Sequence, residues 1–436
     1  MTLELRIEWE EAPGVVAPVL RDTWARLEIQ IQERVVTRFW SERTRCVRDA
    51  VYTSLFPLAR WTVSNWWNLL SEGLCDPSVL RGTRSTARHR AWLGRHNLHC
   101  GREGMAYPDL TFYRMDNGHG AVWQQDPPSI TTPGRFLDAG GARIDTQHVE
   151  AGLAAFVERV IARLGASRNS EADDLRADWS AICRSRTEER ELCERLGALG
   201  LDPYGEDTID AERRVAALEF EGPFLRDLLA ATSVESLQND VKMVKRLLKK
   251  LPEACLTSIH DRGLPLNGES SDLPYLAGYQ RAAAVRKHLG LAPDQAVSDL
   301  WSLIRGLLGE PELSWSRGGS TSMEAVVQAG DRKAVSATNR SSRAKRFLLA
   351  RALHHWVFSF RSGPCLRLIT TARDWQQACS RAFAAELLVP AAALDTTHAG
   401  WDAVDALARR FDVDPMVITH QLDNHFAAGE LPYSNH

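Results

Sequence analysis

Two neighbouring helical patterns between residues 346 and 390 constrain the fold of this chain most. The first is RFLLARALHHWVF, which starts at Arg346, and the second is QQACSRAFAAELLVP, which ends at Pro390. Apolar side chains recur every three or four residues, at Leu349, Leu353, Trp356 and Phe360 and then at Cys379, Phe383 and Leu387. This spacing is typical of helices with one buried face, and proline cannot continue the second helix. We therefore expect two helices here that pack together.

Polar residues occupy another face of each expected helix. Arg351 and His355 are four residues apart, so they lie on the same side of the first helix. Gln377 and Arg381 have the same spacing and share a side of the second helix.

Packing residues in both expected helices fit parts of two sequence motifs. The residues that fit are Arg346, Phe347, Leu349, Ala350, Leu353 and His355, and then Phe383, Ala384, Ala385, Leu387, Leu388 and Pro390. In this pattern the chain resembles the ImmA/IrrE family of zinc metallopeptidases, which typically reads R-F-x-L-A-H-E-L-G-H and then E-x-x-x-N-x-F-A-A-x-L-L-x-P. The resemblance implies a mostly helical, zincin-like metallopeptidase fold with a small sheet beside the cleft.

The positions that carry chemistry in that family are changed in this chain. Arg351 stands where the first histidine ligand belongs, and Ala352 stands where the general-base glutamate belongs. Gln377 replaces the glutamate that would be the third ligand, and Arg381 replaces an asparagine one turn on. Only His355 keeps its identity as a ligand.

These replacements argue against a zinc site. A catalytic zinc needs about three ligands from His, Asp, Glu or Cys, an open position for water and a base for the water's proton. Arginine is a permanent cation without an acceptor, so Arg351 cannot bind zinc. Ala352 cannot act as a base, and the amide oxygen of Gln377 is a poor ligand. We expect no catalytic residue, no cofactor and no bound zinc.

In the zinc site of the ImmA/IrrE family, the corresponding faces of both helices supply ligands to one ion. The resemblance therefore implies that the changed side chains of this chain converge on one pocket. The expected binding pocket consists of Arg351, His355, Gln377 and Arg381. Without zinc, its two guanidinium groups make it positive. We expect it to bind an anion, or to be neutralised by carboxylates such as Asp374 or Glu386.

Three functional hypotheses follow. The favoured one is a catalytically inactive pseudo-metallopeptidase that acts as a regulatory or protein-binding module. Relatives cleave transcriptional repressors in stress responses and mobile elements, so the resemblance implies a setting in stress response or phage defence. The second hypothesis is an active metallo-endopeptidase with other ligands, taken from His354, His355, Cys379 and Glu386. Adjacent helical residues point about 100° apart, however, so one metal cannot easily use both histidines.

The third hypothesis is nucleic-acid binding through a basic run in the N-terminal part. The run contains Arg81, Arg84, Arg88, Arg90, Arg95 and Arg102, with His89 and His96 between them. We favour a solvated surface, because charge runs usually are solvated. His96, His99 and Cys100 offer three zinc ligands, but no fourth ligand has a fitting spacing, so we expect them to have a structural role.

Composition excludes several classes of protein. The chain is 44% hydrophobic and 25% charged with a net charge of −3, which is ordinary for a globular protein and implies no bulk attraction to nucleic acid. Eight scattered cysteines without a CxxC pair indicate reduced thiols in the cytoplasm. No apolar run is long enough for a membrane span, and the acidic start MTLELRIEWEE is no secretory signal.

The chain of 436 residues is long enough for several domains, and its patterns predict an α+β protein. We expect an N-terminal α+β domain of unknown role over 1–165. It contains a hairpin at 24–39 around a turn at 30–32, a second hairpin at 110–124 and a helix over 55–70. A helical connector follows over 166–263. It includes VKMVKRLLKKL, a basic amphipathic pattern that we interpret as a surface helix over a core. The metallopeptidase-like domain is expected over 264–436. It begins with a linker at 264–274 and includes a hairpin over 325–337.

Overall fold

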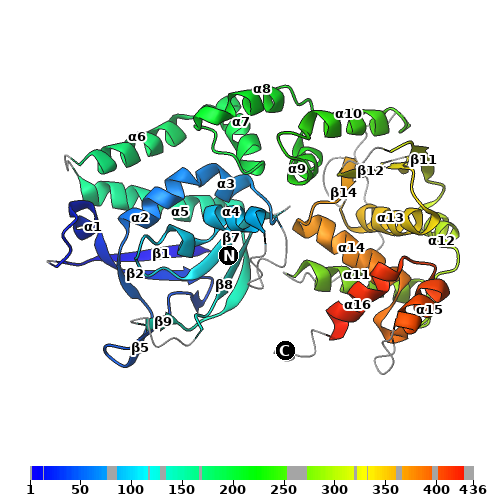
Figure 1. Cartoon of the computed structure of the whole chain (residues 1–436), viewed down its shortest axis with the longest axis horizontal. Helices are drawn as coiled ribbons and strands as arrows, with labels where there is room; N and C mark the ends of the chain where they lie inside the picture. The colour runs from blue at the N-terminus through cyan, green and yellow to red at the C-terminus, as the bar shows by residue number, and fades with distance from the viewer. Residues whose placement is uncertain are drawn as a thin grey trace. The chain divides into compact units, whose positions relative to one another are not determined.

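The computed structural model describes eleven stretches of the chain. They are residues 2–12, 14–75, 86–115, 118–127, 134–165, 169–252, 273–318, 322–330, 332–359, 366–394 and 401–426. Helices and several small sheets alternate along these residues, so the fold is α+β, as predicted (Figure 1). The chain divides into two compact units, Met1–Leu218 and Glu219–His436.

The described residues of unit 1 (Met1–Leu218) form three antiparallel sheets. Its strands are β1 Leu3–Trp9, β2 Trp24–Ile31, β3 Arg34–Val35, β4 Phe39–Ser41, β5 Cys46–Arg48, β6 Val51–Ser54, β7 Asp109–Met115, β8 Gly118–Gln124, β9 Gly134–Phe136 and β10 Gly140–Ile144. In the first sheet β2 pairs with β1, β3 and β6; the others have the orders β10-β8-β7 and β5-β4-β9.

The helices of unit 1 cover the sheets or follow them in the chain. They are α1 Pro18–Asp22, α2 Phe56–Ser64, α3 Trp66–Ser71, α4 Ala87–His96, η2 Leu98–Gly101, α5 Thr146–Leu164, α6 Ser170–Arg184, α7 Thr187–Ala198, η3 Glu206–Thr208 and α8 Ile209–Ala216. α5 contacts β1 and α2, and α7 contacts α3. The first three helices of the expected connector, α6 to α8, therefore belong to unit 1.

Two predictions in unit 1 need correction. The first hairpin turns at Gln32–Glu33 and not at Gln30–Gln32, because fully buried Ile31 continues the alternation of β2. Gln32 takes the positive φ of 57° that such a tight turn requires. The helix expected over 55–70 is interrupted at Asn65, whose side-chain amide donates to the carbonyl of Trp61 at 2.8 Å and competes with the helical backbone. The second hairpin is confirmed as β7 and β8, while its turn residues 116–117 lie outside the described residues.

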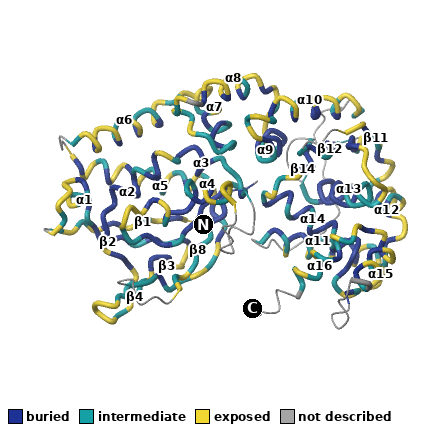
Figure 2. Tube along the Cα trace, in the orientation of Figure 1, coloured by how far each residue is buried: buried dark blue, intermediate teal, exposed yellow. Residues whose placement is uncertain are grey.

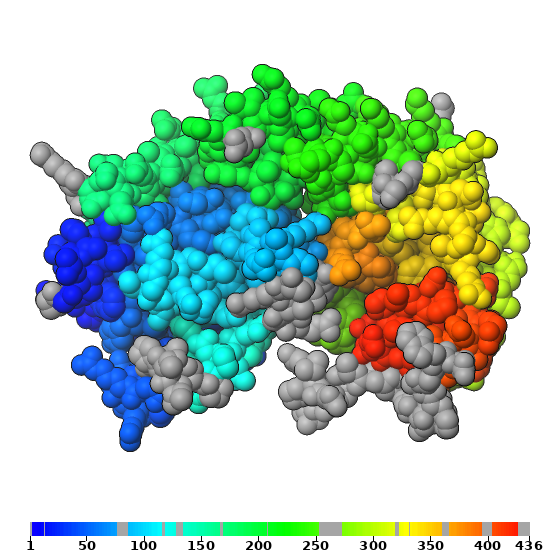
Figure 3. All heavy atoms as spheres, in the orientation of Figure 1, coloured from blue at the N-terminus to red at the C-terminus, as the bar shows by residue number. Residues whose placement is uncertain are grey.

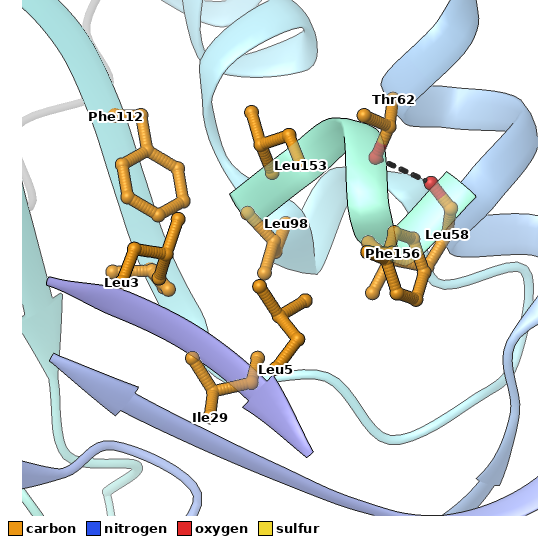
Figure 4. A pocket seen from close by; sticks show the side chains of 10 residues that line it. Leu3, Leu5, Ile29, Leu58, Thr62, Leu98, Phe112, Leu153 and Phe156 are labelled. Atoms are coloured by element: carbon orange, nitrogen blue, oxygen red, sulfur yellow. Dashed lines mark hydrogen bonds between the residues drawn. The ribbon is translucent and has the colours of Figure 1, made fainter. Parts of the chain in front are cut away.

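A small gap lies in the core of unit 1 between β1, β2, α2 and α5 (Figure 4). It is lined by Leu3, Leu5, Ile29, Leu58, Thr62, Leu98, Leu110, Phe112, Leu153 and Phe156. The gap has a volume of about 10 Å³. The Thr62 hydroxyl already donates to the Leu58 carbonyl at 2.8 Å, so a water there would lack the polar partners that it needs. The small volume and the apolar lining of the gap are typical of a packing defect rather than a ligand site.

The described residues of unit 2 (Glu219–His436) form one mixed sheet and several helices, some of which contact it. Its strands are β11 Glu312–Ser316, β12 Met323–Gln328, β13 Ala334–Thr338 and β14 Leu366–Thr370. Its helices are α9 Gly222–Ala231, α10 Leu237–Leu248, α11 Pro274–His288, α12 Leu300–Leu308, α13 Ser342–His354, the π-helical turn η4 His355–Ser359, α14 Trp375–Leu388, η5 Ala391–Ala393, α15 Trp401–Phe411 and α16 Pro415–Phe426. The expected linker lies mostly in 253–272, outside the described residues.

The sheet of unit 2 has the order β11-β13-β12-β14, with β11 parallel to β13 and the other pairs antiparallel. The predicted hairpin of 325–337 is confirmed as β12 and β13. Met323 faces Thr370 and Ala325 faces Ile369, so Glu324 is the extra residue of a β-bulge. A bulge bends its strand and redirects side chains, and this one lies beside the site described below.

The two helices that the sequence predicts are α13 and α14, and they pack together. Leu349, Leu353, Phe383 and Leu387 all belong to one buried cluster, which also includes strand residues of the sheet. Ser341 and Asp374 cap the starts of the two helices by accepting from backbone N–H groups. The position of Phe360, which the sequence assigned to the first helix, lies outside the described residues.

Candidate functional site

Arg351 is the centre of a buried polar cluster between α13, α14 and the sheet. Its residue is only 3% exposed. The guanidinium donates hydrogen bonds to Glu324 Oε2, to Gln377 Oε1 (2.6 Å), to the Thr370 carbonyl (3.0 Å) and to Ser380 Oγ (3.1 Å). Burial lowers the pKa of Arg351, and the adjacent Glu324 carboxylate opposes that shift. Because arginine is not deprotonated in proteins, this side chain remains a cation held by four acceptors.

Gln377 fastens α14 to strand β14. Its Oε1 accepts from Arg351 and from the backbone N–H of Thr370 at 3.0 Å, and its Nε2 donates to the carbonyl of Leu368 at 2.8 Å. An amide oxygen has two lone pairs, and here both are already used. Gln377 therefore has no lone pair left for a metal ion.

Arg381 lies one turn further along α14 and is partly buried. Its Nη1 is 3.5 Å from the Thr370 carbonyl, which also accepts from Arg351. Burial and the neighbouring Arg351 lower the pKa of Arg381 to about 10, so it is still charged at neutral pH. Arg351, Gln377 and Arg381 thus meet around Thr370.

The carboxylate that neutralises Arg351 is Glu324, which the sequence analysis missed. Glu324 also forms an ion pair with Arg340 at 2.9 Å. The expectation for Glu386 is wrong: it accepts from Gln421 at 3.0 Å and lies 3.3 Å from His425 Nε2. Asp374, the other expected carboxylate, caps α14 and attracts both arginines electrostatically.

A signal for Glu324 was present in the sequence. It is the only charged residue of the otherwise mostly apolar strand MEAVVQ. A lone carboxylate in a buried strand needs a hydrogen-bonding or charged partner. Arg351, a buried cation, needs an acceptor for the same reason, so the two could have been paired. The bulge that turns Glu324 toward α13 could not be foreseen, because it depends on the register against β14.

His355 is fully buried but has no hydrogen bond to Arg351, Gln377 or Arg381. It begins the π-helical turn after α13, and its Nδ1 is 3.1 Å from Ser359 Oγ, which also accepts from Gln376. Among the described residues its Nε2 has no partner. Burial first, then the positive charge of Arg367, lowers the pKa of His355 well below its ordinary value, so the ring is neutral. The structure therefore brings together three of the four expected residues by hydrogen bonds, and the fourth has other partners.

The alternative ligands do not form a metal site either. Arg281 on α11 donates to His354 Nε2 at 2.9 Å and to Cys379 Sγ at 3.3 Å, so a cation lies between them. Glu386 belongs to the contacts with α16. Ala352 is fully buried and has no functional group. Within the described residues no group of three or more His, Cys, Asp or Glu side chains is arranged to hold a metal ion.

The basic run of unit 1 is partly neutralised. Arg88 and Arg90 are exposed on α4, but Arg95 forms a two-point ion pair with Glu72 at 2.7 and 2.8 Å. Buried His96 lies 2.8 Å from the Phe112 carbonyl and 3.0 Å from Glu72, so neither ring nitrogen is free for a metal. Arg81 and Arg84 lie outside the described residues.

Comparisons with models of protein families, with curated proteins and with solved structures gave no significant match to this chain. None of the helices in the described stretches combines the length and the apolar character needed to cross a membrane.

Proposed function

We propose that the region 264–436 is a degenerate ImmA/IrrE-like metallopeptidase domain that has lost catalysis and acts as a regulatory or protein-binding module in the cytoplasm. The partner is another protein, and the setting that the resemblance favours is stress response or defence against mobile elements. The expected metal-free state is part of the proposal.

One observation carries this proposal: the 2.6 Å hydrogen bond between Arg351 and Gln377. The resemblance assigns a zinc ligand to each of these positions, and the two side chains do meet. Both are unable to serve, because one is a permanent cation and the other has its oxygen occupied. The contact thus supports the alignment and at the same time opposes metal binding.

The surrounding contacts favour a rigid scaffold over an enzyme. Glu324, Ser380 and Thr370 hold Arg351 in one orientation, and a buried cation with satisfied partners excludes both substrate and water from that position. A scaffold of this kind binds a partner through its outer surface, while the residues at the former metal site stabilise its interior.

A cleavage assay tests the proposal. The purified chain is incubated with a library of fluorogenic peptides with added zinc, and with a chelator. We expect no chelator-sensitive cleavage, and none from Arg351→His alone, because one restored histidine leaves the base and the third ligand absent. The triple variant Arg351→His, Ala352→Glu, Gln377→Glu rebuilds the minimal ligand set and is the variant expected to take up zinc.

Chelator-sensitive cleavage by the unmodified chain would overturn the proposal in favour of an active metallo-endopeptidase. His355→Ala is the matched control, since loss of that cleavage in this variant would identify the metal site. If the folded triple variant bound no zinc, the alignment of these positions with the family would be wrong.

A further inference from the structure

Helix α10 carries an unusual concentration of positive charge. Five of its residues or the two that follow it are basic and exposed: Lys242, Lys245, Arg246, Lys249 and Lys250. The whole chain has only seven lysines among 53 basic residues, and four of the seven are in this short segment. In the space-filling view α10 lies at the surface of unit 2 (Figure 3).

Three of these cations form a stripe along the helix. Lys242, Arg246 and Lys249 are spaced by four and three residues, so they lie within an arc of about 60°. The described residues include no ion-pair or hydrogen-bond partner for any of the three side chains. The flanking residues differ: Lys245 pairs with Glu219 at 2.9 Å, and Lys250 donates to the Trp315 carbonyl at 2.7 Å.

The opposite face of α10 is buried in the interior of unit 2. Met243, Val244 and Leu247 are buried, and α10 contacts β12 and β13 (Figure 2). The one acidic residue of the helix, Asp240, is buried and accepts from the hydroxyls of Thr232 and Ser236. The exposed face therefore carries cations without any acid of its own.

A purely structural helix explains this stripe poorly. Cations in the last turn are favoured by the helix dipole, which accounts for Arg246 and Lys249. Lys242 lies in the middle of the helix, where the dipole gives no benefit. Like charges at spacings of three and four residues repel each other, and surface helices ordinarily alternate them with acids. An anionic partner would remove that repulsion.

We propose that the stripe Lys242, Arg246 and Lys249 binds the phosphate backbone of nucleic acid without regard to sequence. This surface is separate from the Arg351 cluster, and the inference does not depend on the function proposed above. The stripe extends about 10 Å along the helix, which is the axial length of about three phosphates in one strand. Lys345, whose Nζ lies 4.9 Å from the Trp315 ring, and exposed Arg317 add positive charge beyond Lys250.

The chemistry of the stripe favours nucleic acid over other anionic partners. A membrane-binding helix inserts its apolar face into the lipid, but the apolar face of α10 is buried against the sheet. None of the exposed large apolar side chains of the described residues belongs to α10. A protein interface has aromatic or apolar anchors at its centre, which this stripe lacks. Lysine acts as a point charge and suits a backbone of regularly spaced phosphates more than the directed recognition of single carboxylates.

The test is fluorescence anisotropy of the full chain with a short labelled DNA duplex of arbitrary sequence, titrated at two salt concentrations. For three contacted phosphates we expect the affinity to fall roughly 40-fold between about 50 and 200 mM salt. The variant Lys242→Gln, Arg246→Gln, Lys249→Gln should lose about tenfold or more in affinity at low salt and most of its salt dependence. Circular dichroism of the variant verifies that it is folded.

A matched variant controls for net charge. Arg88→Gln, Arg90→Gln and Lys287→Gln remove the same charge from exposed positions on α4 and α11, and this variant should bind DNA as the unmodified chain does. Equal weakening by both variants would overturn the proposal, as would an absence of binding. Vesicles of phosphatidylcholine with phosphatidylserine, or poly-glutamate, bound as tightly as DNA would overturn it in favour of a membrane or an acidic protein.

Discussion

The interior of unit 1 around β1, β2 and α5 is apolar, whereas the interior of unit 2 around α13 and α14 is built on a buried charge. Nine of the ten side chains around the gap in unit 1 are hydrocarbon. In unit 2, Arg351 is nearly inaccessible and depends on four separate acceptors. An apolar core loses stability in proportion to the atoms removed, but a buried ion network fails when a single partner is missing. The comparison predicts different responses to single substitutions.

The largest effect is expected for Arg351→Met. The substitution leaves Gln377 Oε1 and the Thr370 carbonyl with one donor fewer, and leaves Glu324 with Arg340 as its cation. Breaking a buried pair in this way costs about 3–5 kcal/mol, measurable as a shift in urea unfolding followed in unit 2.

The double variant Arg351→Met, Glu324→Gln is the control for that prediction. It removes both charges, and it should recover part of the lost stability, because an uncompensated charge is then no longer buried. A loss below about 1 kcal/mol for Arg351→Met alone would show that the cluster is not a buried ion network.

In unit 1 the corresponding substitution is Leu153→Ala, at the wall of the gap. It enlarges an apolar void, and we expect a loss of about 2–5 kcal/mol in the unfolding free energy of unit 1. Leu153→Met keeps the volume and should cost less than about 1.5 kcal/mol. Equal losses for the two variants would show that the gap can collapse without penalty.

The pH response gives a third contrast. Burial lowers the pKa of His354 and His355 well below the ordinary value of 6.5, and lowers that of His119 in unit 1 to about 3. Below pH 6.5 these histidines bind more protons in the unfolded chain than in the folded chain. Their contribution to the free energy of unfolding is therefore fully present above that pH and is lost as the pH falls. Between about pH 7.5 and 5.5 the loss is about 1.4 kcal/mol per histidine.

Hydrogen exchange measured separately in each unit at the two pH values provides the readout. Unit 2, with two such histidines, should lose about twice as much stability as unit 1. His355→Gln should reduce the pH dependence of the stability of unit 2. An unchanged pH dependence in this variant would contradict the claim that His355 contributes to it.

The smallest effect concerns two equivalent helix caps. Asp374 caps α14 by accepting from the Gln377 N–H, and Asp145 caps α5 by accepting from the Gln147 N–H. Replacement of either aspartate by alanine should cost about 1 kcal/mol, measured by thermal unfolding. A much larger loss for Asp374→Ala would show that this carboxylate also stabilises the arginines strongly.

Sequence periodicity was sufficient to predict α13, α14 and their apolar packing, but not their polar contacts. The pairing of α13 with α14 follows from Leu349, Leu353, Phe383 and Leu387, because regular apolar spacing fixes which face is buried. The meeting of Arg351 with Gln377 followed from the resemblance and the i,i+4 relation. Their neutralisation by Glu324 did not, because a carboxylate 27 residues away is brought near only by the sheet register and its bulge.

His355 shows the other limit of sequence reasoning. Its spacing from Arg351 predicts a shared face on a regular α-helix. The backbone N–H of His355 still bonds to the Arg351 carbonyl, so this relation holds in the structure. A π-helical turn begins at His355, and within it the imidazole has a different partner, with Nδ1 3.1 Å from Ser359 Oγ. The sequence HHWVF does not predict the π-helical turn, since it contains neither glycine nor proline.

The central claim is that Arg351 and Gln377 hold the place of a lost metal. The most direct test is elemental analysis of the chain purified without chelator and then dialysed against zinc. We predict no stoichiometric zinc, because Arg351 repels a cation and Gln377 has no free lone pair. One zinc per chain that disappears in His355→Ala would contradict the account.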